Sequence, residues 1–173
     1  MIPQIYLAVT SFTSLYSAAV KKITTFISYA HADASLAKKL MKALEPLFKT
    51  SAGWEFSNWS DHEILPGERW RDEIEQALAK ADFGLLLLSP QFLASTFISK
   101  DELPRLLAKH MVVPVALRTI PLDGTMNLRG LEDRQIFRDA KNRPFERCNR
   151  ESDRGDFALE LMGKIHKMLA KYA

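Results

Sequence analysis

The fold of this chain is decided by residues 82–107, DFGLLLLSPQFLASTFISKDELPRLL. Residues 83–88 are apolar except for Gly84, and Ser89 ends the run. A run this short and this uniformly apolar is typical of a strand that is buried on both faces. Such strands lie in the middle of parallel sheets that helices cover on both sides. The segment therefore predicts an α/β fold around a parallel sheet.

A helix is expected to follow this strand directly. Ser89 offers a capping hydroxyl and Pro90 suits the first helical position. The helix then starts at the carboxyl end of the sheet, which is the edge where open α/β sheets bind ligands. Its apolar side is expected to comprise Phe92, Leu93, Phe97, Leu103, Leu106 and Leu107. An acidic pair, Asp101 and Glu102, precedes its second half.

The rest of the chain alternates between strand and helix patterns. Strands are expected at residues 23–29, 53–59 and 111–117, with a possible short edge strand at 134–137. Helices are expected after residue 33, over residues 69–81 and over residues 156–172, and an exposed loop at residues 60–68. This order predicts a doubly wound, flavodoxin-like parallel sheet of about five strands flanked by helices.

Three residues give local expectations. Asp33 is placed to cap the first helix, and Pro46 is expected to mark its frayed end. Pro114 lies inside an apolar strand, so its nitrogen should face an unpaired or bulged edge.

The bulk composition excludes several classes of protein. The 173 residues suit one domain, and the net charge of +3 is modest. A basic run between residues 138 and 154 is better explained as a solvated loop than as a nucleic-acid site. The single cysteine, Cys148, excludes an internal disulfide, and the four histidines lack ligand spacing, so no metal site is expected. A reducing, cytoplasmic location is predicted.

Residues 1–22 are treated as a leader before the domain at residues 23–173. No charged side chain precedes Lys21, and the larger apolar residues recur at helical spacing. A secretory signal would carry a basic region first, and a membrane span would not normally contain Pro3, Gln4 and so many hydroxyls. An extra helix packed on the domain or on a neighbouring copy is therefore predicted. Membrane association, export and an unstructured leader are the alternatives.

Several catalytic motifs are absent from the sequence. The seven glycines form neither a phosphate-binding loop nor a dinucleotide fingerprint, and no GxSxG elbow is present. A phosphoacceptor receiver domain shares the strand order, but it needs acidic residues at the ends of the first and third strands. The third strand here ends in Leu88 and Ser89.

A set of motifs, taken in order, resembles the Toll/interleukin-1 receptor (TIR) domain family of the bacterial, NAD-cleaving type. The motifs are FISYAHAD, WSDHEILPGERW, LLLLSPQFLAS, DEL and VVPVAL, and the resemblance covers residues 23 to about 171. It implies that the first motif forms the floor of a nucleotide pocket. It also implies that the loop at residues 60–68 gates this pocket and mediates assembly, and that Glu102 is catalytic.

The implied reaction is cleavage of the bond between nicotinamide and ribose in NAD⁺, which is then a substrate, so that no cofactor is expected. Nicotinamide leaves as a neutral molecule, so the reaction needs no general acid. It does need a carboxylate, here Glu102, to stabilise the positive charge that develops on the ribose. Candidate stacking residues for nicotinamide or adenine are Tyr29, Trp59 and Phe97, and candidate contacts to the ribose and pyrophosphate are His31 and Asp61.

One departure from the family pattern concerns the catalytic register. Many members carry WCxxE, whereas this chain has FISKDE, in which Phe97 lies five residues before Glu102. Either the helix is offset by one residue, or Asp101 competes with Glu102 for the catalytic role. Glu102 is favoured because the following Leu103 matches the EL of the family and because a glutamate reaches further.

Two functions remain open from the sequence. The first is an NAD⁺ glycohydrolase that makes linear or cyclic ADP-ribose, as an assembly-activated effector of bacterial antiphage defence. The second is a non-catalytic TIR–TIR interaction module. Both predict self-association. The chain is expected either to respond to a sensor or activating partner protein or to be part of a longer protein, and no contact with nucleic acid or a membrane is expected.

Overall fold

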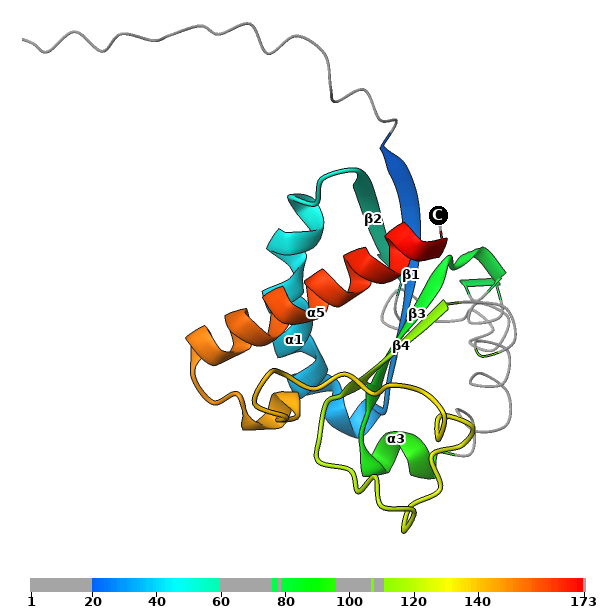
Figure 1. Ribbon diagram of the computed structural model, residues 1–173, viewed down its shortest axis with the longest axis vertical. Helices are drawn as coiled ribbons and strands as arrows, with labels where there is room; N and C mark the ends of the chain where they lie inside the picture. The colour runs from blue at the N-terminus through cyan, green and yellow to red at the C-terminus, as the bar shows by residue number, and fades with distance from the viewer. Residues whose placement is uncertain (1–19, 60–75, 78, 96–106, 108–110, 173) are drawn as a thin grey trace, which may run out of the picture.

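The computed structural model describes residues 20–59, 76–77, 79–95, 107 and 111–172. Its centre is a four-stranded sheet with the order β2-β1-β3-β4, in which every pairing is parallel (Figure 1). The strands are β1 (Lys21–Tyr29), β2 (Trp54–Trp59), β3 (Phe83–Leu88) and β4 (Met111–Ala116). The predicted parallel α/β sheet is thus confirmed. β2 lies on one side of β1, and β3 and β4 lie on the other side. The direction in which successive strands are added to the sheet therefore reverses between β1 and β3.

A fifth strand is reduced to a single bridge in the described residues. Phe137 pairs with Val115 in parallel, within the stretch where a short edge strand was expected. The Phe137 N–H donates to the Pro114 carbonyl at 2.7 Å, and the Ala116 N–H donates to the Phe137 carbonyl at 2.9 Å. Because the nitrogen and carbonyl of one strand residue point to the same side, the nitrogen of Pro114 faces the side of the Phe137 bridge and not β3.

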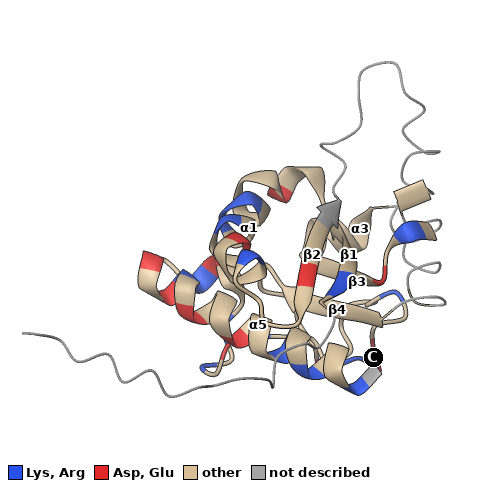
Figure 2. Ribbon diagram, turned by 90° about the horizontal axis from the view of Figure 1, so that it is seen from above, with Lys and Arg blue, Asp and Glu red and all other residues tan. Residues whose placement is uncertain are grey.

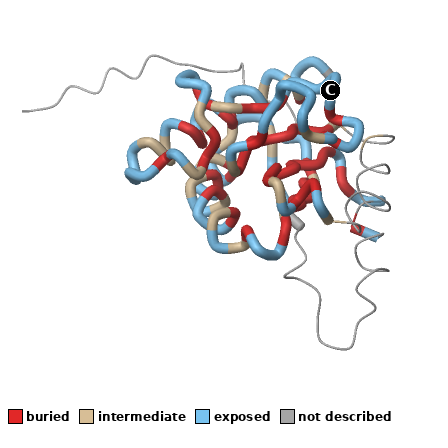
Figure 3. The backbone as a smooth tube through the Cα atoms, turned by 90° about the horizontal axis from the view of Figure 1, so that it is seen from below, coloured by how far each residue is buried: buried red, intermediate tan, exposed pale blue. Residues whose placement is uncertain are grey.

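The central strand is buried on both faces, which confirms the interpretation of its apolar run. Phe83, Leu85 and Leu87 belong to one hydrophobic cluster, and Leu86 and Leu88 belong to a second cluster on the other face. All five side chains are fully buried. Figure 3 shows buried residues running through the middle of the molecule.

Two long helices cover the first of these faces. They are α1 (Ala34–Lys49) and α5 (Glu151–Tyr172), which lie side by side (Figure 1). Their buried residues include Ala37, Leu40, Leu44 and Phe48 of α1 and Phe157, Leu161, Ile165 and Leu169 of α5. The lysines of α1 lie on its exposed outer side (Figure 2).

The end of α1 and the start of α5 differ from the sequence predictions. α1 continues through Pro46 to Lys49, because Leu44 and Phe48 on its inner side are packed in the core and hold the last turn in place. α5 begins at Glu151 rather than at residue 156, and the acidic Glu151 and Asp153 suit the positive end of the helix dipole.

The helix after β3, in contrast, is shorter than predicted. α3 runs only over Pro90–Ala94, and Ser95 is extended with φ −67° and ψ 122°. The prediction of one continuous helix to Leu107 was therefore wrong at Ser95. Its predicted start was correct, because the Ser89 side chain accepts from the Phe92 N–H at 2.9 Å.

Several predictions lie outside the described residues. They concern the leader, apart from its last residues 20–22, and the loop at residues 60–68, and they also include most of the helix predicted at 69–81. Of that helix, residues 76–77 and 79–80 are helical, and Ala77 is buried in the second cluster. Within the described part of the chain, no helix is long and apolar enough to cross a membrane.

Candidate functional site

Three of the predicted site residues lie at the carboxyl edge of the sheet. Tyr29 is the last residue of β1 and is half-buried, and His31 is exposed in the short helix η1 (His31–Asp33) that follows. Trp59 is the last residue of β2, where its backbone pairs with Phe26. The other three predicted residues, Asp61, Phe97 and Glu102, and the competitor Asp101 lie outside the described residues.

Asp33 lies at the same edge and has a role that differs from the predicted one. It occupies the N-cap position of α1, but its side chain makes no capping hydrogen bond. Its side chain is instead 1% exposed, and its two carboxylate oxygens accept from the Ser89 hydroxyl and from Arg118 Nε, the latter at 2.5 Å. A buried carboxylate needs such donors because desolvation of an unpaired charge is costly. The prediction that the Asp33 side chain caps the helix was therefore wrong.

Ser89 connects two parts of this edge. Its hydroxyl donates to Asp33 after β1 and accepts from the Phe92 N–H in the first turn of α3. Ser89 is itself fully buried. One side chain thus fixes the start of α3 relative to the end of β1.

Arg118 extends the contacts from Asp33 towards the segment before α5. Its Nη1 lies 3.5 Å from Glu146 Oε2, and Glu146 Oε1 accepts from the Thr119 N–H at 2.8 Å and the Thr119 hydroxyl at 2.6 Å. We call Asp33, Ser89, Arg118, Thr119 and Glu146 the strand-end network. It joins the carboxyl ends of β1, β3 and β4.

The charges of the strand-end network stabilise one another. The hydrogen bond to Asp33 raises the pKa of the Arg118 guanidinium, despite partial desolvation. Burial raises the pKa of Glu146, but the Thr119 donors and the nearby Arg118 outweigh it, so the pKa of this carboxyl lies below its ordinary value. Arg118 and Glu146 therefore stay ionised at neutral pH, and their arrangement is suited to holding strand ends in place.

The strand-end network was missed because its partners are far apart in the sequence. Asp33 is separated from Ser89 by 56 positions and from Arg118 by 85. A signal was nevertheless present, since each of these polar residues follows closely on a predicted apolar strand. Polar residues at the carboxyl ends of neighbouring parallel strands meet at one edge of a sheet.

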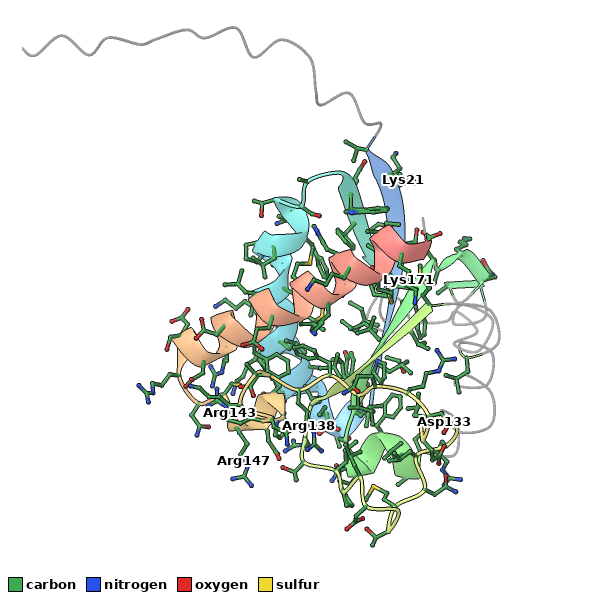
Figure 4. The ribbon with its side chains drawn as sticks, viewed as in Figure 1. Lys21, Asp133, Arg138, Arg143, Arg147 and Lys171 are labelled. Carbon is green, nitrogen blue, oxygen red and sulfur yellow. The ribbon has the colours of Figure 1, made fainter. Side chains whose placement is uncertain are left out.

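The basic run between residues 138 and 154 is largely used within the fold. Arg143 bonds Asp139 at 2.8 Å and Asp153 at 3.4 Å, and Arg154 donates to the Cys148 carbonyl at 2.9 Å. Arg138 donates to the Ile120 carbonyl at 2.9 Å. Figure 4 shows Arg138, Arg143 and Arg147 along the segment that leads into α5. Because these arginines bond to other parts of the fold, the bonds favour a structural role for the basic run over a nucleic-acid site.

A separate cavity of about 330 Å³ lies at the outer side of β4. Its walls include Val112, Pro114 and Phe137, together with Lys164 and Met168 of α5. The β4 residues in these walls come from the middle and amino-terminal part of the strand, so the cavity does not coincide with the strand-end network. In the described residues, no group of three or more histidine, cysteine or acidic side chains could hold a metal ion.

Comparison with known proteins agrees with the fold. The family model of the TIR domain matches residues 25–148, which is most of the chain. The chain belongs to the TIR domain family. It is also 32% identical over 100 residues to y4lF of Sinorhizobium fredii, an uncharacterized protein, and the aligned part covers 55% of this chain and 30% of that protein.

Proposed function

We propose that this TIR domain is an NAD⁺ glycohydrolase that releases nicotinamide and ADP-ribose. The observation that supports this proposal is the common position of Tyr29, His31 and the start of α3 at the carboxyl edge of the sheet. This edge lies beside the reversal of strand order between β1 and β3, where doubly wound sheets bind nucleotides. The chain continues from α3 to Glu102, the residue proposed to be catalytic.

The proposed chemistry requires one carboxylate. As the bond to nicotinamide lengthens, positive charge moves from the pyridinium ring to the ribose, and the Glu102 carboxylate stabilises it. Tyr29, Trp59 and Phe97 are the proposed stacking residues for the flat rings of the substrate, and His31 and Asp61 are the proposed polar contacts. Water then attacks the ribosyl cation to give linear ADP-ribose, or an adenine nitrogen attacks it to give a cyclic product.

Assembly and partners form part of the proposal. TIR domains generally self-associate, and we propose that this chain is active as an assembly of copies. An assembly-activated NAD⁺ glycohydrolase fits an effector of antiphage defence, because depletion of NAD⁺ stops growth of the infected cell. A sensor or activating protein would then control assembly.

The proposal is tested by measuring nicotinamide release from NAD⁺ by the purified chain at high protein concentration. Glu102→Gln keeps the size of the side chain and removes its charge, and Asp101→Asn is the matched control one position away. Release by the wild type that is lost only in Glu102→Gln supports the proposal. Loss only in Asp101→Asn would place the catalytic carboxylate at Asp101.

A second outcome would favour the non-catalytic alternative. The wild-type chain would release no nicotinamide, even when copies are brought together by a fused oligomerisation domain. The proposal of an enzyme would then be wrong. The TIR–TIR interaction module would be the better description, and self-association measured by light scattering would test it.

A further inference from the structure

We propose that Asp33 is a positioning residue: through Ser89 it sets the place of the start of α3 at the sheet edge that also carries Tyr29 and His31. This inference rests on the proposed function for its catalytic consequence. Its structural part rests on contacts among the described residues alone.

Both carboxylate oxygens of Asp33 are paired. The carboxylate is 1% exposed, and each of its oxygens accepts a bond from a different strand end, from Ser89 after β3 and from Arg118 after β4. A buried carboxylate is costly to desolvate and is weak evidence for stability by itself. The arrangement does, however, define the relative positions of three strand ends within hydrogen-bonding tolerance.

The Ser89 hydroxyl makes two hydrogen bonds. It donates to Asp33 and accepts from the Phe92 N–H, so the orientation that caps α3 is the one that Asp33 selects. Asp33→Asn keeps only one acceptor oxygen, for which Arg118 competes with the Ser89 hydroxyl, so the hydroxyl is no longer held in one orientation. The first turn of α3 then loses a fixed acceptor, although the Leu93 N–H still bonds the Ser89 carbonyl at 3.1 Å.

The strand ends are held together by more than the contacts of Asp33. The strand ends are also held by backbone bonds, because the Leu117 and Arg118 N–H groups both donate to the Leu88 carbonyl, at 2.9 and 3.0 Å. The Glu146 N–H donates to the Leu117 carbonyl at 2.9 Å. These bonds do not depend on Asp33. We therefore expect Asp33→Asn to fold and to shift the start of α3.

Asp139 offers a matched control for this substitution. Its side chain is 5% exposed, and its Oδ2 accepts from Arg143 Nε at 2.8 Å. Its other oxygen accepts from the backbone N–H groups of Lys141 and Arg143, so its bonds stay within one loop. Asp139→Asn thus removes a buried, arginine-paired carboxylate without touching Ser89 or α3.

The experiment compares Asp33→Asn, Ser89→Ala, Ser89→Thr and Asp139→Asn in the full 173-residue chain. Hydrogen exchange is measured for residues 90–95, together with the melting temperature and with kcat and KM for nicotinamide release. We expect faster exchange at residues 90–95 in Asp33→Asn and Ser89→Ala, and wild-type exchange there in Asp139→Asn. We expect kcat to fall about tenfold or more in the first two variants, because small misplacements of reacting groups slow catalysis strongly. KM should change little, and Ser89→Thr should recover most of kcat.

Two results would overturn the inference. One is wild-type exchange at residues 90–95 in Asp33→Asn. The other is a loss of kcat in Asp139→Asn that equals the loss in Asp33→Asn at an equal fall in melting temperature. If the wild type releases no nicotinamide, the proposed function fails instead, and the exchange measurement alone decides whether Asp33 positions α3.

Discussion

The hydroxyl of Ser89 donates to the carboxylate of Asp33, although 56 positions separate the two residues in the sequence. The parallel pairing of β1 with β3 explains the contact. Tyr29 pairs with Leu87, so the residues that follow the two strands leave the sheet at the same edge. Both side chains are buried there, which makes their contact a part of the core as well as of the candidate site.

The loss of the Ser89 hydroxyl should destabilise the fold. Ser89→Ala removes the cap of α3 and one of the donors to a buried carboxylate, and we expect a cost of about 1–3 kcal/mol in the free energy of unfolding. Urea denaturation measures this cost. Ser35→Ala is the control, since Ser35 is exposed in the first turn of α1. An equal effect in the two variants would contradict the prediction.

The central strand should be sensitive to loss of volume. Leu85 is fully buried in the middle of β3, and Leu85→Ala should lower the free energy of unfolding by about 2–5 kcal/mol, because it leaves a cavity in the core. Leu159→Ala on α5 is the matched control, because Leu159 is 57% exposed, and it should change stability by less than about 0.5 kcal/mol. Comparable losses in denaturant titrations would mean that β3 is not central.

Glu146 should contribute stability that acid removes. Its pKa in the folded protein lies below the ordinary value of 4.5, so the unfolded chain binds more protons in this range. The contribution is therefore present above about pH 4.5 and is lost as the pH falls through the lower, folded pKa. We expect Glu146→Gln to be less stable than the wild type at neutral pH, and the difference to shrink below about pH 4.5. Urea titrations across this range measure it.

A second variant checks the cause of that pH dependence. Thr119→Val removes the hydroxyl that donates to Glu146 at 2.6 Å but keeps the backbone donor. The loss of stability in acid should then be smaller than in the wild type. If Thr119→Val loses as much stability in acid as the wild type, the hydroxyl does not lower the pKa of Glu146.

Cys148 should be protected from thiol reagents in the native state. Its side chain is 2% exposed, and burial raises the pKa of its thiol, so little of the reactive thiolate is present at neutral pH. Labelling with a disulfide reagent should be slower by about 100-fold or more in buffer than in concentrated urea. Rapid labelling of the native protein would mean that the segment before α5 opens readily.

The sequence predicted the features that depend on neighbouring residues. The bounds of β3 follow from an apolar run between Asp82 and Ser89, and the start of α3 follows from the Ser-Pro pair. The end of α3 was not predicted, because the apolar residues after Ser95 repeat at helical spacing although the backbone at Ser95 is extended. Pro46 was misleading for a similar reason, because packing of Leu44 and Phe48 outweighs its local preference.

The sequence by itself determined the parallel α/β architecture, because burial of a strand on both faces leaves a continuous apolar run that no surface element shows. It also carried the motifs of the TIR family. Only the tertiary structure decided what Asp33 does, because the partners of its carboxylate come from the ends of β3 and β4, 56 and 85 positions away. A local pattern describes a side chain's preference, whereas the strand pairing decides which donors reach a buried charge.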